Sequence, residues 1–121
     1  MILVDSSIWV DHLRRGDARL GALLESGQVL THPFVIGELA LGNLRQRDTI
    51  LLSLHDLPSA IRADDGEVLN LIKRYALAGT GIGYIDAHLL ASARLMAAPL
   101  WTRDKRLHQA AIKLGLDHKH A

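Results

Sequence analysis

The chain has 121 residues and a mass of 13.3 kDa, enough for one domain and too little for two. Hydrophobic residues make up 49% and charged residues 22%, which excludes an intrinsically disordered chain, and the 4% of aromatic residues predicts a mostly aliphatic core. A net charge of +1 is far from that of a typical duplex-DNA binder, and the absence of cysteine excludes disulfides, thiolate zinc sites and cysteine nucleophiles.

Short aliphatic segments predict the strands of a sheet. They lie at residues 2–5, 28–31, 59–62 and 99–102, with a weaker signal at 116–119, where His118 and His120 would share a face. None of these segments resembles a signal peptide, and no apolar run approaches the roughly 20 residues that span a bilayer. We therefore expect a soluble, cytoplasmic protein without a membrane segment.

Helical patterns separate the predicted strands. Ser6 or Ser7 is placed to cap the first helix, Pro33 suits the first turn of the third, and Asp64 or Asp65 suits the cap of the fifth. The predicted helices cover residues 6–15, 18–26, 33–42, 48–55, 64–79, 84–97 and 104–114. Short aliphatic strands that alternate with helices predict an α/β fold, a sandwich with a central parallel sheet between two helical layers. We expect it to form one domain over residues 1–121.

Four acids stand where strand or helix ends would aim them at one edge of this sheet: Asp5, Glu38, Asp86 and Asp104. Carboxylates brought close together repel one another, so a cluster of four indicates a bound divalent cation. Each acid alone could instead be a helix cap, a first-turn residue favoured by the helix dipole, or an ordinary surface residue. Glu38 fits that reading least, because its neighbours are nearly all apolar.

Basic residues are clustered near two of these acids. Arg14 and Arg15 follow the first strand, and Arg103, Lys105 and Arg106 surround Asp104. Such clusters suit a phosphodiester substrate such as RNA, although most basic clusters are solvated surface.

Together the segments resemble the PIN-domain nucleases, and specifically the small endoribonuclease toxins of the VapC type. The resemblance covers essentially the whole chain and rests on four segments in order. They are Ile2-Leu-Val-Asp5-Ser-Ser7, Glu38-Leu39, Ile85-Asp86-Ala-His-Leu-Leu-Ala91-Ser-Ala93 and Leu100-Trp-Thr102-Arg-Asp104-Lys-Arg-Leu107.

The resemblance implies a PIN-like three-layer fold and a catalytic role for the four acids, which would hold one or two Mg²⁺ or Mn²⁺ ions. Ser7 and Thr102 would support them, and metal-activated water would cleave RNA. Some family members carry a further acid where this chain has Lys105 and Arg106, which leaves a second metal open. The resemblance also implies a homodimer in a bacterium or archaeon, inhibited by a small antitoxin that carries a DNA-binding domain.

Two other functions stay open at this point. A phosphatase of the aspartyl-phosphate type also begins with an aliphatic strand that ends in Asp, but it usually has a second Asp where this chain has Ser7. A catalytically silent PIN-like module that binds RNA would keep the fold and lose acids, whereas all four are present here.

Overall fold

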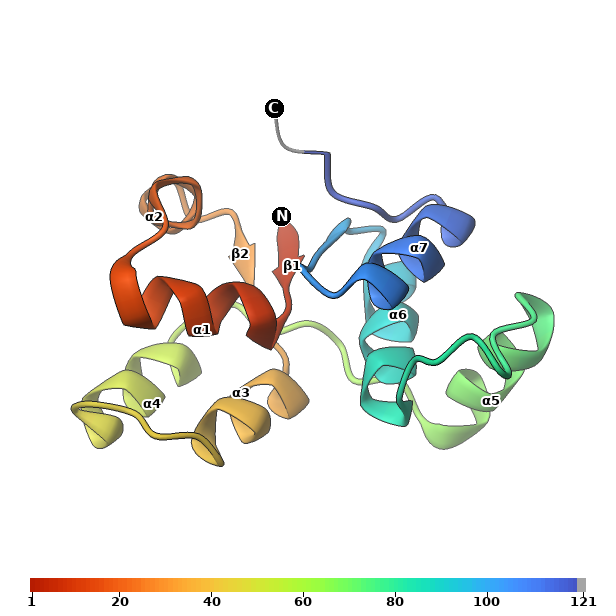
Figure 1. Ribbon diagram of the computed structural model, residues 1–121, viewed down its shortest axis with the longest axis horizontal. Helices are drawn as coiled ribbons and strands as arrows, with labels where there is room; N and C mark the ends of the chain where they lie inside the picture. The colour runs from red at the N-terminus through yellow and green to blue at the C-terminus, as the bar shows by residue number, and fades with distance from the viewer. Residues whose placement is uncertain (120–121) are drawn as a thin grey trace.

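The computed structural model describes residues 1–119, and the predicted position of His120 lies outside them (Figure 1). Within this range no helix is long and apolar enough to cross a membrane. The elements in chain order are β1 (Ile2–Val4), α1 (Ser6–Arg15), α2 (Ala18–Glu25), β2 (Val29–Leu30), α3 (Pro33–Ala40), α4 (Arg47–His55), α5 (Asp65–Arg74), α6 (Tyr84–Met96), β3 (Leu100–Trp101) and α7 (Lys105–Leu114).

The sheet is parallel and short, with strand order β2-β1-β3. Leu3 of the central strand is paired with Leu30 on one side and with Leu100 on the other. Because all three strands run in the same direction, their carboxyl ends meet at one edge of the sheet. The backbone N–H of Asp5 donates to the Trp101 carbonyl at 2.9 Å, which holds the ends of β1 and β3 together at this edge.

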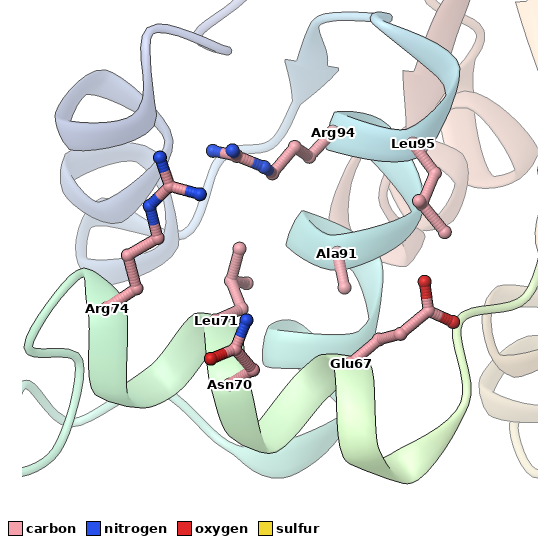
Figure 2. A pocket seen from close by; sticks show the side chains of 7 residues that line it. All are labelled: Glu67, Asn70, Leu71, Arg74, Ala91, Arg94 and Leu95. Carbon is pink, nitrogen blue, oxygen red and sulfur yellow. The ribbon is translucent and has the colours of Figure 1, made fainter.

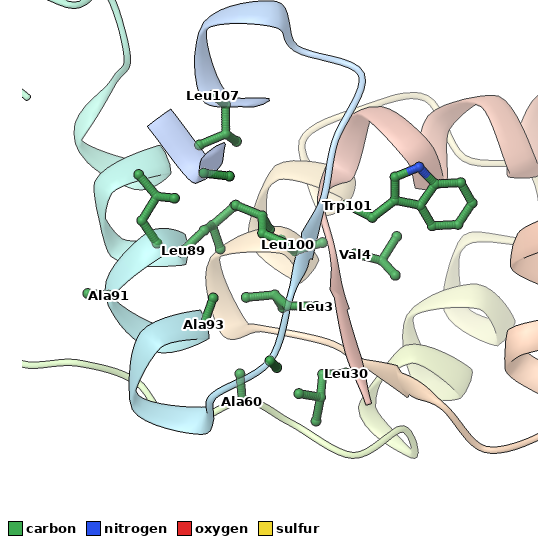
Figure 3. Packing of buried hydrophobic residues seen from close by; sticks show 14 of the residues in the cluster. Leu3, Val4, Leu30, Ala60, Leu89, Ala91, Ala93, Leu100, Trp101 and Leu107 are labelled. Carbon is green, nitrogen blue, oxygen red and sulfur yellow. The ribbon is translucent and has the colours of Figure 1, made fainter. Parts of the chain in front are cut away.

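Helices cover both faces of the sheet, as the α/β sandwich prediction requires. In Figure 1, α1 to α4 gather on one side of the strands and α5 to α7 on the other. Side chains alternate along the strands, so that Leu3 and Leu100 point toward α6 while Val4 and Trp101 point the other way (Figure 3). All four are at most 2% exposed. Burial on both faces explains why the strands are continuous apolar runs.

The predictions of strands at 59–62 and 116–119 are wrong. Each segment forms a single parallel bridge, Thr31 with Ser59 and Leu100 with Asp117. Ala60 still donates its N–H to the Thr31 carbonyl at 2.8 Å, but Ile61 and Arg62 are exposed and the chain leads on to the cap of α5. These segments pair too briefly with the sheet to continue as strands.

The fifth helix is also shorter than predicted, because it ends at Arg74 and not near residue 79. Ala76 has a φ of +52°, and Leu77 donates its N–H to the Ile72 carbonyl at 3.0 Å, which together close the helix. The Leu77 side chain is only 3% exposed. Burial of this leucine therefore favours a turn where helical periodicity alone predicts continuation.

Candidate functional site

Asp5 lies at the carboxyl end of β1 and is the N-cap residue of α1, with 5% of its surface exposed. Its carboxylate makes no capping bond, and the prediction that Ser6 or Ser7 caps this helix is wrong. Instead Oδ2 of Asp5 accepts hydrogen bonds from the hydroxyls of Ser7 and Thr102, both at 2.8 Å. These two bonds fix the orientation of the carboxylate and leave Oδ1 on the side of Glu38.

Ser6 connects the first two acids, a role that sequence reasoning did not find. Its hydroxyl lies 3.3 Å from Oε1 of Glu38 and 3.5 Å from Oδ1 of Asp5. The available signal was that the first turn of α1 starts directly after Asp5, so that its hydroxyls lie beside the end of β1. Sequence reasoning assigned this serine to the helix cap alone.

Glu38 comes from the second half of α3 and is partly buried. Burial raises the pKa of its carboxyl above the ordinary value, and the negative charges of Asp5 and Asp86 raise it further, against the bond from Ser6. Glu38 therefore lies within electrostatic reach of both acids.

Asp86 and Asp104 begin helices on the other side of the sheet. Oδ2 of Asp86 accepts from the Gly83 N–H at 3.2 Å, and Oδ1 of Asp104 accepts from the Leu107 N–H at 2.9 Å. Burial raises the pKa of Asp86, with further contributions from the charges of Asp5 and Asp104. Each acid thus uses one oxygen to cap its helix. Among residues 1–119 the other oxygen has no hydrogen-bond partner.

The four acids are brought to one edge of the sheet but are not drawn into a compact shell. In the part of the chain that the structure describes, no group of three or more His, Cys, Asp or Glu side chains is arranged to hold a metal ion. No Lys, Arg or His of residues 1–119 forms an ion pair with any of the four.

The predicted basic residues lie around this edge in different settings. Arg103 binds Oδ2 of Asp11 at 2.5 Å and Oδ2 of Asp17 at 2.8 Å, so a phosphate would have to compete for its guanidinium. The side chain of Arg106 lies against Gly81, where an added Cβ would come within 2.7 Å of Nη1. Lys105 is exposed in the first turn of α7.

The remaining two basic residues belong to α1. Arg15 pairs loosely with Asp11 at 3.8 Å, and Arg14 lines a groove next to Glu38.

This groove has a volume of about 700 Å³. It lies between α1, α3, α4 and the loop that joins α3 to α4. Ser6 and Glu38 form part of its wall. The remaining lining combines apolar side chains with polar ones: Val10, Leu13, Leu39, Leu44 and Ile50, and Arg14, Asn43 and Arg45. A second, smaller cavity of about 140 Å³ lies between α5 and α6, where Arg74 and Arg94 approach each other (Figure 2). It contains none of the predicted site residues, so the larger groove is the one associated with the acids.

The chain is similar in sequence to known proteins. The PIN domain family matches residues 2–113. Ribonuclease VapC32 of Mycobacterium tuberculosis, from strains CDC 1551 / Oshkosh and ATCC 25618 / H37Rv, is 49% identical over 117 residues. The alignment covers 96% of this chain and 94% of that protein.

Two solved structures share the fold. FitAcB from Neisseria gonorrhoeae has a TM-score of 0.66 at 22% identity, over 93% of this chain and 94% of that one. FitAB bound to an IR36 DNA fragment has a TM-score of 0.63 at 19% identity, over 99% and 100%. The family match over residues 2–113 and the 49% identity to a VapC protein both show the family of this chain. The chain belongs to the PIN-domain family and to its VapC-type members.

Proposed function

We propose that this protein is a metal-dependent endoribonuclease and the toxin of a toxin–antitoxin pair. The observation that carries the proposal is a set of four acids at one sheet edge that lack a basic partner within residues 1–119. Burial, together with the charges of the neighbouring acids, raises the pKa of Glu38 and Asp86 there. Such an arrangement costs free energy unless a cation binds to it. The name of the VapC relative, a ribonuclease, supports RNA as the substrate.

The donor atoms suit Mg²⁺ or Mn²⁺. They are carboxylate oxygens supported by hydroxyls, the hard ligands these ions prefer, and Mg²⁺ commonly takes only one or two carboxylates and keeps several waters. Among residues 1–119, one oxygen of each of Glu38, Asp86 and Asp104 accepts no hydrogen bond, which is compatible with that mode of binding. We propose Asp5, Glu38, Asp86 and Asp104 as the residues that would hold the ion. When bound, it would supply Lewis-acid stabilisation of phosphoryl charge and a water of lowered pKa.

The chain's own residues have distinct roles in this proposal. Ser7 and Thr102 hold the Asp5 carboxylate in one orientation, and the helix-capping bonds do the same for Asp86 and Asp104. Burial and the charges of neighbouring acids raise the pKa of both Glu38 and Asp86, which suits either carboxylate to accept a proton during the reaction. The Ser7 hydroxyl argues against an aspartyl-phosphate phosphatase, because it occupies the position of that class's second Asp and engages Oδ2 of Asp5.

Cleavage of RNA by the purified protein tests the proposal. Activity should require Mg²⁺ or Mn²⁺, stop with EDTA and return when metal is added back. Asp5→Asn and Asp86→Asn should each lose roughly two orders of magnitude in rate, because each removes a charge that binds metal while nearly preserving shape. Full activity after rigorous chelation, in protein shown by elemental analysis to be free of metal, would refute the metal mechanism.

We propose that the antitoxin binds in the groove beside Glu38. Apolar side chains of an antitoxin segment would contact Leu13, Leu39 and Ile50, while an Arg or Lys of the same segment would reach the acids. A cation there substitutes for the metal charge and forms strong charge-assisted hydrogen bonds. Inhibition would then compete with metal or RNA.

A further inference from the structure

A partly exposed aromatic surface borders the candidate site. It consists of Phe34 at the start of α3, Tyr84 at the start of α6, and Arg62 from the segment that joins α4 to α5. The guanidinium carbon of Arg62 lies 4.7 Å from the centre of the Phe34 ring. Tyr84 is 48% exposed, and Phe34 is partly exposed. We refer to these three residues as the aromatic platform.

The rings of Phe34 and Tyr84 both pack against a buried histidine, His88. His88 is 1% exposed, and its ring meets those of Phe34 and Tyr84 edge to face, with centroid distances of 4.8 Å in both pairs. The Tyr84 hydroxyl also donates to Oδ1 of Asp65 at 2.9 Å. The rings are therefore preorganised and would lose little conformational entropy on contact with a ligand.

The placement is unusual for a chain with so few aromatic residues. Two Trp, two Tyr and one Phe are all it has, and both Trp residues belong to a core that is otherwise built from aliphatic side chains. A phenylalanine side chain stabilises a fold strongly when it is buried, because its apolar area is large. Phe34, the sole phenylalanine, nevertheless stays partly exposed beside the guanidinium of Arg62. A binding role explains this exposure, whereas a role in the core does not.

The platform lies next to the acids along both helices. Phe34 precedes Glu38 by one turn and shares its side of α3, whereas Tyr84, in the same first turn of α6 as Asp86, faces His88 on another side of that helix. The charges of Glu38 and Asp86 are in turn coupled to each other. A nucleotide chain that runs past the acids would therefore meet the platform within its next residues.

We propose that the aromatic platform stacks an unpaired nucleobase of the RNA, adjacent to the phosphate that lies at the acids. Base-to-aromatic stacking is the common mode by which proteins bind unpaired RNA, and a planar guanidinium can extend the stack or contact a phosphate. The inference rests on the proposed ribonuclease function and adds to it the form of the substrate. Single-stranded or looped RNA fits the platform, and a continuous duplex, whose bases are stacked on each other, does not.

Binding measured in EDTA tests the platform separately from cleavage. The probe is a fluorescein-labelled oligoadenylate of about ten nucleotides, compared with an equally long ribose-phosphate oligomer that lacks bases. Phe34→Leu and Tyr84→Leu should each weaken binding of the oligoadenylate by roughly tenfold, because leucine keeps apolar contact with His88 but offers no ring. Neither variant should change binding of the base-free oligomer, and Tyr84→Phe should bind the oligoadenylate as the wild type does.

Tyr75→Leu is the matched control. Tyr75 also lies beside arginines, with the guanidinium carbons of Arg74 and Arg94 at 5.5 and 5.1 Å from its ring centre. It follows α5 and packs against the last turn of α6, whereas Asp86 lies in the first turn of that helix. This variant should bind the oligoadenylate with unchanged affinity. Circular dichroism confirms that each variant is folded.

Photocrosslinking of the wild-type protein gives a second readout that needs no variant. A 4-thiouridine oligonucleotide should crosslink to peptides that contain Phe34 or Tyr84. Absence of these crosslinks, or wild-type affinity in both folded leucine variants, would overturn the platform. If the platform is overturned but the protein still cleaves RNA, the nuclease proposal stands without it. If the leucine variants weaken binding of the oligoadenylate but the protein cleaves no RNA, the platform stands and the nuclease proposal fails.

Discussion

Thr102 donates a hydrogen bond from Oγ1 to Oδ2 of Asp5 at 2.8 Å, across 97 positions of the sequence. The same Oγ1 accepts the backbone N–H of Asp104 at 3.0 Å. One hydroxyl therefore links the carboxylate at the end of β1 to the backbone of the acid that begins α7. It sets the relative positions of two of the four acids.

Replacement of Thr102 by valine should reduce activity without unfolding the protein. The change removes a bond that orients Asp5, and loss of such supporting bonds typically costs about 10- to 100-fold in metal affinity or activity. It should also lower the free energy of unfolding by roughly 1–3 kcal/mol, since a buried carboxylate oxygen loses a partner. Thr102→Ser retains the hydroxyl and should stay close to wild type in RNA cleavage and urea unfolding. Equal activity in the two variants contradicts the orienting role.

The metal-free protein should gain stability from its site acids as the pH falls. Folding raises the pKa of Glu38 and Asp86 above 4.5 and 3.8. The folded state thus binds protons more tightly than the unfolded chain, and the repulsion present at neutral pH is relieved as the pH drops through the raised values. Glu38→Gln and Asp86→Asn should melt at the wild-type temperature or above it near neutral pH in EDTA. The difference should shrink toward pH 4.5, and a constant difference contradicts the assignment.

The pH dependence of stability should also contain a term of opposite sign from His32. Its side chain is fully buried, its Nδ1 accepts the Phe34 N–H and its Nε2 donates to Ser92. Burial, with the charges of His88 and Arg62, lowers its pKa from 6.5 to about 4. Between these two pH values the unfolded chain binds a proton that the folded chain does not bind. The free energy of unfolding therefore falls as the pH falls, by up to about 1.4 kcal/mol per pH unit.

His32→Asn isolates this contribution, because asparagine can accept the Phe34 N–H and does not titrate. Urea unfolding of both proteins at about pH 7 and pH 5 is the measurement. The wild type should lose more free energy of unfolding than the variant over this interval. Parallel losses would show that His32 titrates normally.

The protein is expected to form a homodimer. The described residues include exposed aliphatic side chains, among them Leu69 at 60% and Leu95 at 47% exposure, and the weak net charge of +1 offers little repulsion between copies. Light scattering at tens of micromolar should give twice the chain mass of 13.3 kDa. A mass of 13.3 kDa across the concentration range would contradict the dimer.

Inhibition by the antitoxin should depend on the metal concentration. If an Arg or Lys of the antitoxin occupies the acids, added Mg²⁺ competes with it and raises the apparent inhibition constant. A titration of Mg²⁺ against a fixed concentration of antitoxin peptide measures this effect. An inhibition constant that does not change with metal, for a peptide that also leaves RNA binding intact, would indicate inhibition from a remote site.

The sequence by itself determined the order of elements, the parallel sheet and the family. These follow from local features: aliphatic runs such as Ile2–Val4 alternate with helical patterns, and acids stand at their ends. The predictions of strands at 59–62 and 116–119 were wrong, because each segment forms only one bridge to the sheet. Whether a segment continues to pair with a sheet depends on the path of the chain that follows it, and a local sequence pattern does not contain that information. The bridging role of Ser6 was missed for a similar reason, since its hydroxyl serves α3 as well as its own helix.

Only the tertiary structure decided how the side chains at the site are used. It turned the Asp5 carboxylate toward Thr102 and away from the cap of α1, and it engaged Arg103 with Asp11 and Asp17. It also brought Phe34 of α3 into contact with His88 of α6, whose ring also meets that of Tyr84. Apart from the contact between Tyr84 and His88, these interactions join different elements of the chain, so their geometry depends on how the helices pack against both faces of the sheet. Spacing along the sequence carries no information about that packing.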